Sequence, residues 1–263
     1  FKKDKGAFAA LITLSAILVF VIIFNIYIRI SGDYKSYFDV DLLNIFLKPG
    51  EDGFLLGTDV GGHSVFGWLM MGMLNSILIA VAVTFITITF GTMVGLVIAY
   101  YGGRVDNFVM RFVDFMVIIP VLMVIIVFVS IKRDYGIGLF IFILSAFAWM
   151  SSTRLVRSKA LSESRRDYVL ASKTMGTPDW KIMLKGILPN ISSIIVVEAT
   201  LSLAANMGIE VGLTYLGFGL PAGTPSIGTM LSYAKDADVL VNKMYIWLPA
   251  ALAILVIVLC INS

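Results

Sequence analysis

The chain has 263 residues, of which 59% are hydrophobic and only 14% are charged, and its mean hydropathy is +0.95. Soluble domains average about 45 to 50% apolar residues, so this composition predicts a membrane protein. The net charge of +3, without a long basic tract, gives no support for nucleic-acid binding. A single cysteine, Cys260, excludes a disulfide within the chain, and a single His63 without a Cys/His cluster argues against a metal site.

Stretches of about 20 mostly apolar residues predict transmembrane helices, because a helix pairs its own backbone amides where water is absent. The third such stretch contains Pro120 at mid-depth, which predicts a kink. The first is longer than the roughly 7 to 15 residues of a signal-peptide core, so we expect it to be a span. The six stretches cover residues 7–30, 69–101, 108–130, 136–153, 192–217 and 244–262.

These spans predict an all-α polytopic membrane helical bundle, with residues 1–263 as a single transmembrane domain. Positive residues accumulate on the cytoplasmic side of membrane proteins. With both termini inside, thirteen of the 20 Lys and Arg residues fall in inner segments or at the adjoining span ends. We therefore expect a cytoplasmic loop at about 154–191 and outer loops at about 31–68 and 218–243.

The stretch from Asp167 to Asn190 within this cytoplasmic loop is charged and contains turn residues. Local signals predict a first short helix from about Ser164 to Met175, closed by Gly176. We expect Thr177 to cap a second helix that has Pro178 and Asp179 in its first turn and ends near Pro189–Asn190. Either helix could pack on the protein's own spans or on another protein through its apolar side. The apolar residues at helical spacing are Tyr168, Ala171, Met175, Trp180, Met183, Leu184, Ile187 and Leu188.

Ala171, Gly176 and Leu188-Pro189 resemble the cytoplasmic loop of ABC importer permeases, which has the form E-A-A, three residues, G, nine residues, I-x-L-P. Further stretches resemble the oligopeptide and dipeptide permeases of the type-I fold. These are LGTDVGG (56–62), YYGGRVDNFVMRFVDFMVIIP (100–120), RDYVLASKTMG (166–176), GILPN (186–190) and YLGFGLPAGTPSIGTML (215–231). The chain departs from this branch at His63, within Gly62-His63-Ser64 where the branch has G-R-D, and at Ile227, where it has Trp.

The resemblance implies a multi-pass permease subunit of an ATP-driven peptide importer in a bacterial inner or plasma membrane, with cytoplasmic termini. It implies that Ala171, Gly176, Trp180, Leu188 and Pro189 couple the permease to ATPase subunits. The implied partners are a second homologous permease, two ATPase subunits that bind ATP and Mg, an extracytoplasmic peptide-binding protein and membrane lipid. The cargo stays open between a long peptide, a dipeptide and a metal chelate.

We expect no catalytic residue or cofactor site in the chain itself. The stretch nearest to a phosphate-binding loop, Gly223 to Thr229, lacks the lysine that would hold phosphates. An ion-coupled secondary transporter is the alternative function, because it would use buried acids as ion sites and need no ATPase. That alternative does not explain the two short helices of the cytoplasmic loop.

Polar residues within the spans are candidates for a pathway or a partner contact, because a charge at mid-membrane costs about 2.5 to 3.5 kcal/mol. Asn206 and Glu210 are about one turn apart in the fifth span and share a side, whereas Glu198 lies roughly 80° round the helix from Asn206. Whether these three residues line the route or pair with a partner permease stays open. Asp114 is expected to pair with Arg111 on the same helix.

Two glycine pairs, Gly91-x-x-x-Gly95 and Gly208-x-x-x-Gly212, predict close packing between helices.

Overall fold

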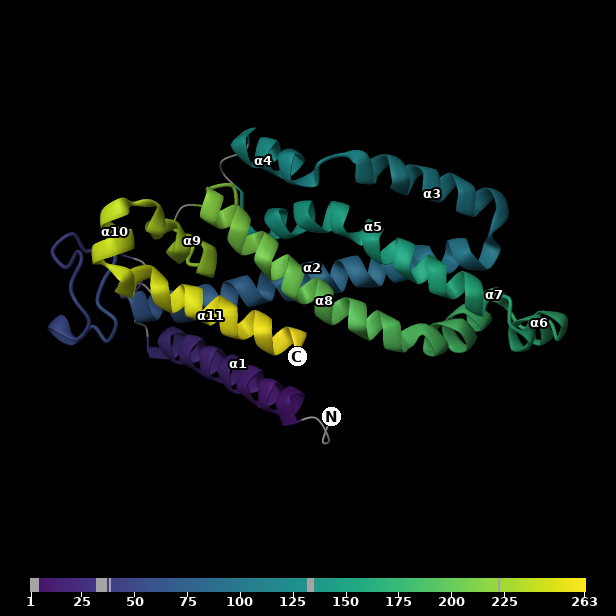
Figure 1. Ribbon diagram of the computed structural model, residues 1–263, viewed down its shortest axis with the longest axis horizontal. Helices are drawn as coiled ribbons and strands as arrows, with labels where there is room; N and C mark the ends of the chain where they lie inside the picture. The colour runs from purple at the N-terminus through teal and green to yellow at the C-terminus, as the bar shows by residue number, and fades with distance from the viewer. Residues whose placement is uncertain (1–4, 32–36, 38, 132–134, 222) are drawn as a thin grey trace. The chain divides into compact units, whose positions relative to one another are not determined.

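The computed structural model describes residues 5–31, 37, 39–131, 135–221 and 223–263, and over these residues it is helical without a strand (Figure 1). Five helical segments are long and apolar enough to cross a membrane, and a bent pair, taken as one span, makes a sixth. This confirms the predicted all-α polytopic bundle. The five are α1 (Lys5–Ser31), α2 (Val65–Tyr101), α5 (Ile137–Glu163), the segment from α7 (Asp179–Lys181) through α8 (Leu188–Leu216), and α11 (Met244–Asn262).

The bent pair confirms the kink predicted at Pro120. Helix α3 (Gly103–Ile118) ends two residues before the proline, and α4 (Val121–Ile131) begins directly after it, at an angle of 68°. Ile119 takes an extended conformation (φ −69°, ψ 125°), as expected for a residue whose α-helical geometry would clash with the following proline ring. Pro120 has no N–H to continue the helix, so the local sequence is sufficient to explain the break.

The chain folds as two compact units, each with its own core. The first unit comprises Phe1–Val81, Lys132–Ile137 and Leu203–Ser263, and the second comprises Ala82–Ile131 and Gly138–Ser202. In the first unit, buried apolar side chains of α1, α2, α8 and α11 form one cluster with those of the short helix α9 (Ile227–Ser232). In the second unit, one end of α2 packs with α5, α6 (Asp167–Thr174) and the start of α8. The remaining short elements are η1 (Glu51–Gly53), η2 (Ile182–Ile187), η3 (Tyr233–Lys235) and α10 (Ala237–Asn242).

The predicted end of a helix near Pro189–Asn190 is wrong, because α7 continues through η2 into α8 without a break. Element η2 is a π-helix, in which the Leu188 N–H bonds to the Met183 carbonyl five residues earlier. A π turn disturbs the regular α-helical pairing, and Pro189 lacks the N–H that this pairing would need. The two irregularities coincide, which lets a proline lie inside a continuous helix.

Other boundaries of the cytoplasmic loop also differ from expectation. Helix α5 extends to Glu163, ten residues beyond the predicted span, and α6 begins at Asp167 rather than Ser164. Pro178, and not Thr177, is the residue that precedes the first turn of α7, and it makes no side-chain cap. Gly176 has φ +75°, which confirms its left-handed conformation at the end of the first short helix.

Candidate coupling site

Helix α6 packs on the rest of the second unit through one buried side chain and through polar contacts at two places. Val169 is fully buried among apolar residues of α2, α5 and η2. At the end of α2, the Tyr100 hydroxyl donates to Asp179 Oδ1 over 2.7 Å, and Lys173 Nζ lies 4.1 Å from the centre of the Tyr100 ring. Tyr100 therefore contacts both short helices, α6 through a cation–π interaction and α7 through a hydrogen bond. In Figure 1, α6 lies beside α7 at one end of this unit.

A second clamp joins α6 to the beginning of α8. Asn190 Nδ2 donates to the Tyr168 hydroxyl over 3.1 Å and to the Gly186 carbonyl over 2.9 Å, and the Tyr168 hydroxyl donates to Glu163 over 3.1 Å. Partial burial of the ring raises the pKa of the Tyr168 phenol above its ordinary value, so its proton stays available for donation. The loop is thus fixed to α5 on one side and to α8 on the other.

The loop also presents large apolar side chains that remain well exposed within the described chain. Leu170 is 52% exposed, Met175 76%, Trp180 54% and Leu184 47%. A group of large apolar side chains outside the core, bordered by polar residues, is typical of a protein contact. We call Leu170, Ala171, Met175, Gly176 and Trp180 the coupling surface.

The five residues expected to couple to ATPase subunits all lie in the second unit. Ala171, Gly176, Trp180 and Pro189 are exposed, whereas Leu188 is partly buried against the unit's core. Trp180 and Leu188 also line an apolar groove of about 470 Å³ that α2 forms with η2 and α8.

The anchoring residues were not found from the sequence. Tyr100 stands out in the sequence only as the first residue of the stretch 100–120, and Val169 lies outside the set of apolar residues at helical spacing. The position of Tyr100 at the predicted inner interface was a usable signal, since tyrosines concentrate there with one apolar and one polar end.

The polar residues of the fifth span lie in two different environments. Glu198, in the second unit, is partly buried, and its Oε1 accepts bonds from Ser152 over 3.4 Å and Ser202 over 3.3 Å. Asn206 and Glu210, in the first unit, are 7% and 0% exposed. Their predicted roles in a pathway or a partner contact stay predictions.

The predicted pairing of Asp114 with Arg111 is wrong. Asp114 instead pairs with Arg154 of α5 at 2.5 Å, and Arg157 of α5 pairs with Asp106 of α3 through two bonds. The reason is tertiary packing: α5 brings arginines to α3 at points that spacing along one helix does not reveal. The Asp106 pair is the more buried, with side chains 27% and 12% exposed, against 42% and 61% for the other.

The two glycine pairs behave differently. A Cβ atom at Gly91 would lie 2.7 Å from Ser152 Cβ, and one at Gly95 would lie 2.9 Å from the Thr153 carbonyl, so α2 and α5 are in backbone contact there. This confirms close packing for the first pair. A Cβ at Gly208 or Gly212 would meet no atom within 4 Å, so close packing at that pair stays a prediction.

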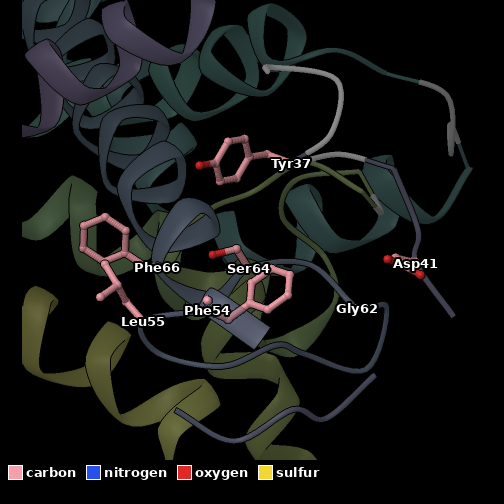
Figure 2. Close-up of a pocket in the computed structure, with 8 residues that line it drawn as sticks. Tyr37, Asp41, Phe54, Leu55, Gly62, Ser64 and Phe66 are labelled. Atoms are coloured by element: carbon pink, nitrogen blue, oxygen red, sulfur yellow. The ribbon is translucent and has the colours of Figure 1, made fainter. Parts of the chain in front are cut away.

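The segment before α2, in the first unit, contains a hollow of about 390 Å³. Figure 2 shows the rings of Tyr37, Phe54 and Phe66 around Ser64, with Asp41 at the far edge. Within the same segment, Asp59 Oδ1 accepts the backbone N–H groups of Gly61 and His63, and its Oδ2 accepts the Tyr233 hydroxyl over 3.0 Å. Burial, followed by the Asp59 charge, raises the pKa of Tyr233, so its hydroxyl stays a donor.

Comparison with known proteins adds to this picture. Residues 88–263 match the family described as "binding-protein-dependent transport system inner membrane component". The "oligopeptide transport system permease protein OppC" of Lactococcus lactis subsp. lactis (strain IL1403) is 45% identical over 260 residues, which cover 99% of this chain and 87% of that protein. The OppC protein of Mycobacterium tuberculosis (strain ATCC 25618 / H37Rv) is 31% identical over 228 residues, 86% of this chain and 77% of its own length. The "dipeptide transport system permease protein DppC" of Lactococcus lactis subsp. cremoris (strain MG1363) is 31% identical over 205 residues, 77% of this chain and 60% of its own length.

Proposed function

The chain belongs to the family of binding-protein-dependent transport system inner membrane components, and from this premise we propose that it is a permease subunit of an ATP-driven peptide importer. The names of its relatives, oligopeptide and dipeptide permeases, support peptides as the cargo. The helical segments long enough to span a membrane support a role in the translocation pathway. The chain itself contributes no catalysis in this proposal; ATP and Mg²⁺ bind to separate ATPase subunits.

The observation that carries the proposal is the coupling surface. It is apolar, it is exposed, and it is attached to a helix that runs unbroken from Asp179 to Leu216. A partner that binds Trp180 and Met175 would move α7. The π-helix η2 and α8 would move with it, because no loop separates them from α7. The clamps through Tyr100 and Tyr168 would carry the same movement to the ends of α2 and α5.

In addition to this chain and lipid, the proposed complex has three kinds of component. A second homologous permease completes the membrane part, one of two ATPase subunits docks on the coupling surface from the cytoplasm, and an extracytoplasmic peptide-binding protein delivers the cargo. The hollow beside Tyr37 and Phe54, on a predicted outer segment, is a candidate contact for that binding protein. Cytoplasmic termini belong to the same proposal.

The experiment is to replace Gly176 by proline and to measure recovery of the ATPase subunits with the permease, ATP hydrolysis and peptide uptake. Proline fixes φ near −65°, whereas Gly176 has φ +75° and donates its N–H to the Lys173 carbonyl. We expect normal membrane insertion but loss of coupling between hydrolysis and uptake. A tryptophan at Ala171, which is exposed on the same surface, should produce the same phenotype by steric exclusion.

Gly50 offers a matched control. It also has a positive φ, of +87°, its N–H bonds to the Phe54 carbonyl, and its Cβ position is open, but it lies on the predicted outer side. Gly50→Pro should leave ATPase recovery unchanged. Normal coupled uptake in both Gly176→Pro and Ala171→Trp would remove the coupling role.

A further inference from the structure

Glu210 lies on α8 inside the first unit, and its side chain is completely buried. Thr214, one turn further along α8, donates its hydroxyl proton to Glu210 Oε1 over 3.0 Å. The hydroxyls of Ser76 on α2 and Ser226 before α9 face the same carboxylate. The second oxygen, Oε2, is buried and has no bond of its own within ordinary hydrogen-bond limits, so it is available to these two hydroxyls. None of the ion pairs in the described parts of the chain includes Glu210.

Each of the three hydroxyls also accepts a backbone N–H from the segment that leads into α9. A hydroxyl that accepts one such bond still has its own proton to donate. Thr214 thus links the carboxylate to the Leu220 backbone, while Ser76 and Ser226 hold the Ile227 and Thr229 backbone beside the same carboxylate. We call these three links between a hydroxyl and the backbone the relays. The backbone bonds are Leu220 N–H to Thr214 at 3.3 Å, Ile227 N–H to Ser76 at 3.2 Å, and Thr229 N–H to Ser226 at 3.0 Å.

The same segment fits closely against α2 and α8. A Cβ at Gly72 would lie 2.9 Å from the Ser226 backbone, and one at Gly228 would lie 2.6 Å from Thr214 Cβ. Asn75 Nδ2 donates to the Pro225 carbonyl over 2.8 Å. The backbone and side chains of this segment are therefore in direct contact with α2 and α8.

We propose that Glu210 is a positioning residue that fixes α9 and the turn before it against α2 and α8, and that this fixed arrangement is required for transport. This adds a third role to the two that the sequence left open, pathway lining and partner contact. The requirement for transport rests on the proposed function, whereas the fixing of α9 does not. The two parts are therefore measured separately.

The test uses a cysteine at Met230, which lies on α9 and is 1% exposed. In a background without Cys260, a membrane-impermeant maleimide is added from outside to cells that contain the whole transporter. Glu210→Gln should increase the labelling rate of Met230→Cys at least about tenfold, because the amide replaces one acceptor oxygen with an NH₂ donor that faces the hydroxyls. Peptide uptake should fall, while recovery of the second permease with the chain stays unchanged.

Glu198→Gln is the matched control, because it makes the same change on the same helix. Glu198 accepts only the hydroxyls of Ser152 and Ser202 and has no relay to α9, so labelling of Met230→Cys should not change. If Glu210→Gln prevents accumulation of the protein, Thr214→Val removes one relay with little change of shape and should increase labelling at least about twofold.

Three results would overturn the proposal. Unchanged labelling in the tested variant would show that α9 does not depend on the relays. Unchanged labelling together with loss of the second permease would assign Glu210 to the partner contact instead. Faster labelling with normal uptake would show that the fixed position of α9 is not needed for transport.

Discussion

Replacing Gly91 by alanine should destabilise the second unit, because α2 and α5 approach each other through their backbones at this point. The added Cβ would lie 2.7 Å from Ser152 Cβ and 2.8 Å from the Trp149 carbonyl oxygen. Ordinary contacts between carbon atoms are about 3.5 to 4.0 Å, so the helices must separate by close to 1 Å. Gly91 also accepts a bond from the Thr153 hydroxyl over 3.3 Å, which this separation would weaken.

The expected magnitude follows from two opposing effects. Forcing a methyl group into a packed contact costs about 1 to 3 kcal/mol, and alanine gains up to about 1 kcal/mol over glycine in a helix interior. The net change is therefore a loss between zero and about 3 kcal/mol. Gly95→Ala should behave similarly, because its Cβ would lie 2.9 Å from the Thr153 carbonyl oxygen. The two losses need not add, since both variants separate the same helix pair.

Gly208→Ala is the control, because it makes the same change in a second glycine pair where a Cβ meets no atom within 4 Å. Only the helical preference of alanine remains there, so its stability should be equal to the native value or greater by up to about 1 kcal/mol. The assay is the midpoint of thermal or denaturant unfolding of the purified permease in detergent. The steric explanation would be refuted if Gly91→Ala were as stable as Gly208→Ala.

Two further predictions concern ion pairing and topology. Asp106→Asn should destabilise the second unit by about 3 kcal/mol, because it leaves a mostly buried arginine without its partner, whereas Asp114→Asn, at an exposed pair, should change the unfolding free energy by less than about 1 kcal/mol. Equal effects in an unfolding assay would contradict this ranking. With the native cysteine removed, Lys173→Cys should react with an impermeant maleimide only from the cytoplasmic side and Leu43→Cys, at a 93% exposed position, only from outside. Labelling of Lys173→Cys from outside alone would reverse the predicted topology.

The features that the sequence predicted correctly are those that depend on local chemistry. Long apolar runs predicted the spans, because a membrane core requires them whatever the neighbours are. Pro120 predicted the break between α3 and α4, since the missing N–H and the ring act within one turn. Gly176 predicted the left-handed residue after α6 for a similarly local reason.

The features that the sequence missed depend on residues far apart in the chain. Asp114 pairs with Arg154, forty residues away, although Arg111 lies one helical turn from it. Pro189 does not end a helix, because the π segment before it changes the backbone pairing and accommodates the missing donor. Neither outcome can be read from spacing along a single helix.

The two carboxylates of α8 show the same limit and also give it a functional meaning. Glu198 and Glu210 have the same chemistry on one helix, yet the first accepts two hydroxyls of the second unit and the second is sealed within the first unit. In the proposed transporter, Trp180 and Glu210 belong to one helical segment, thirty residues apart in the sequence, without an intervening loop. The coupling surface and the position of α9 are for this reason expected to change together, and neither should be studied as an isolated site.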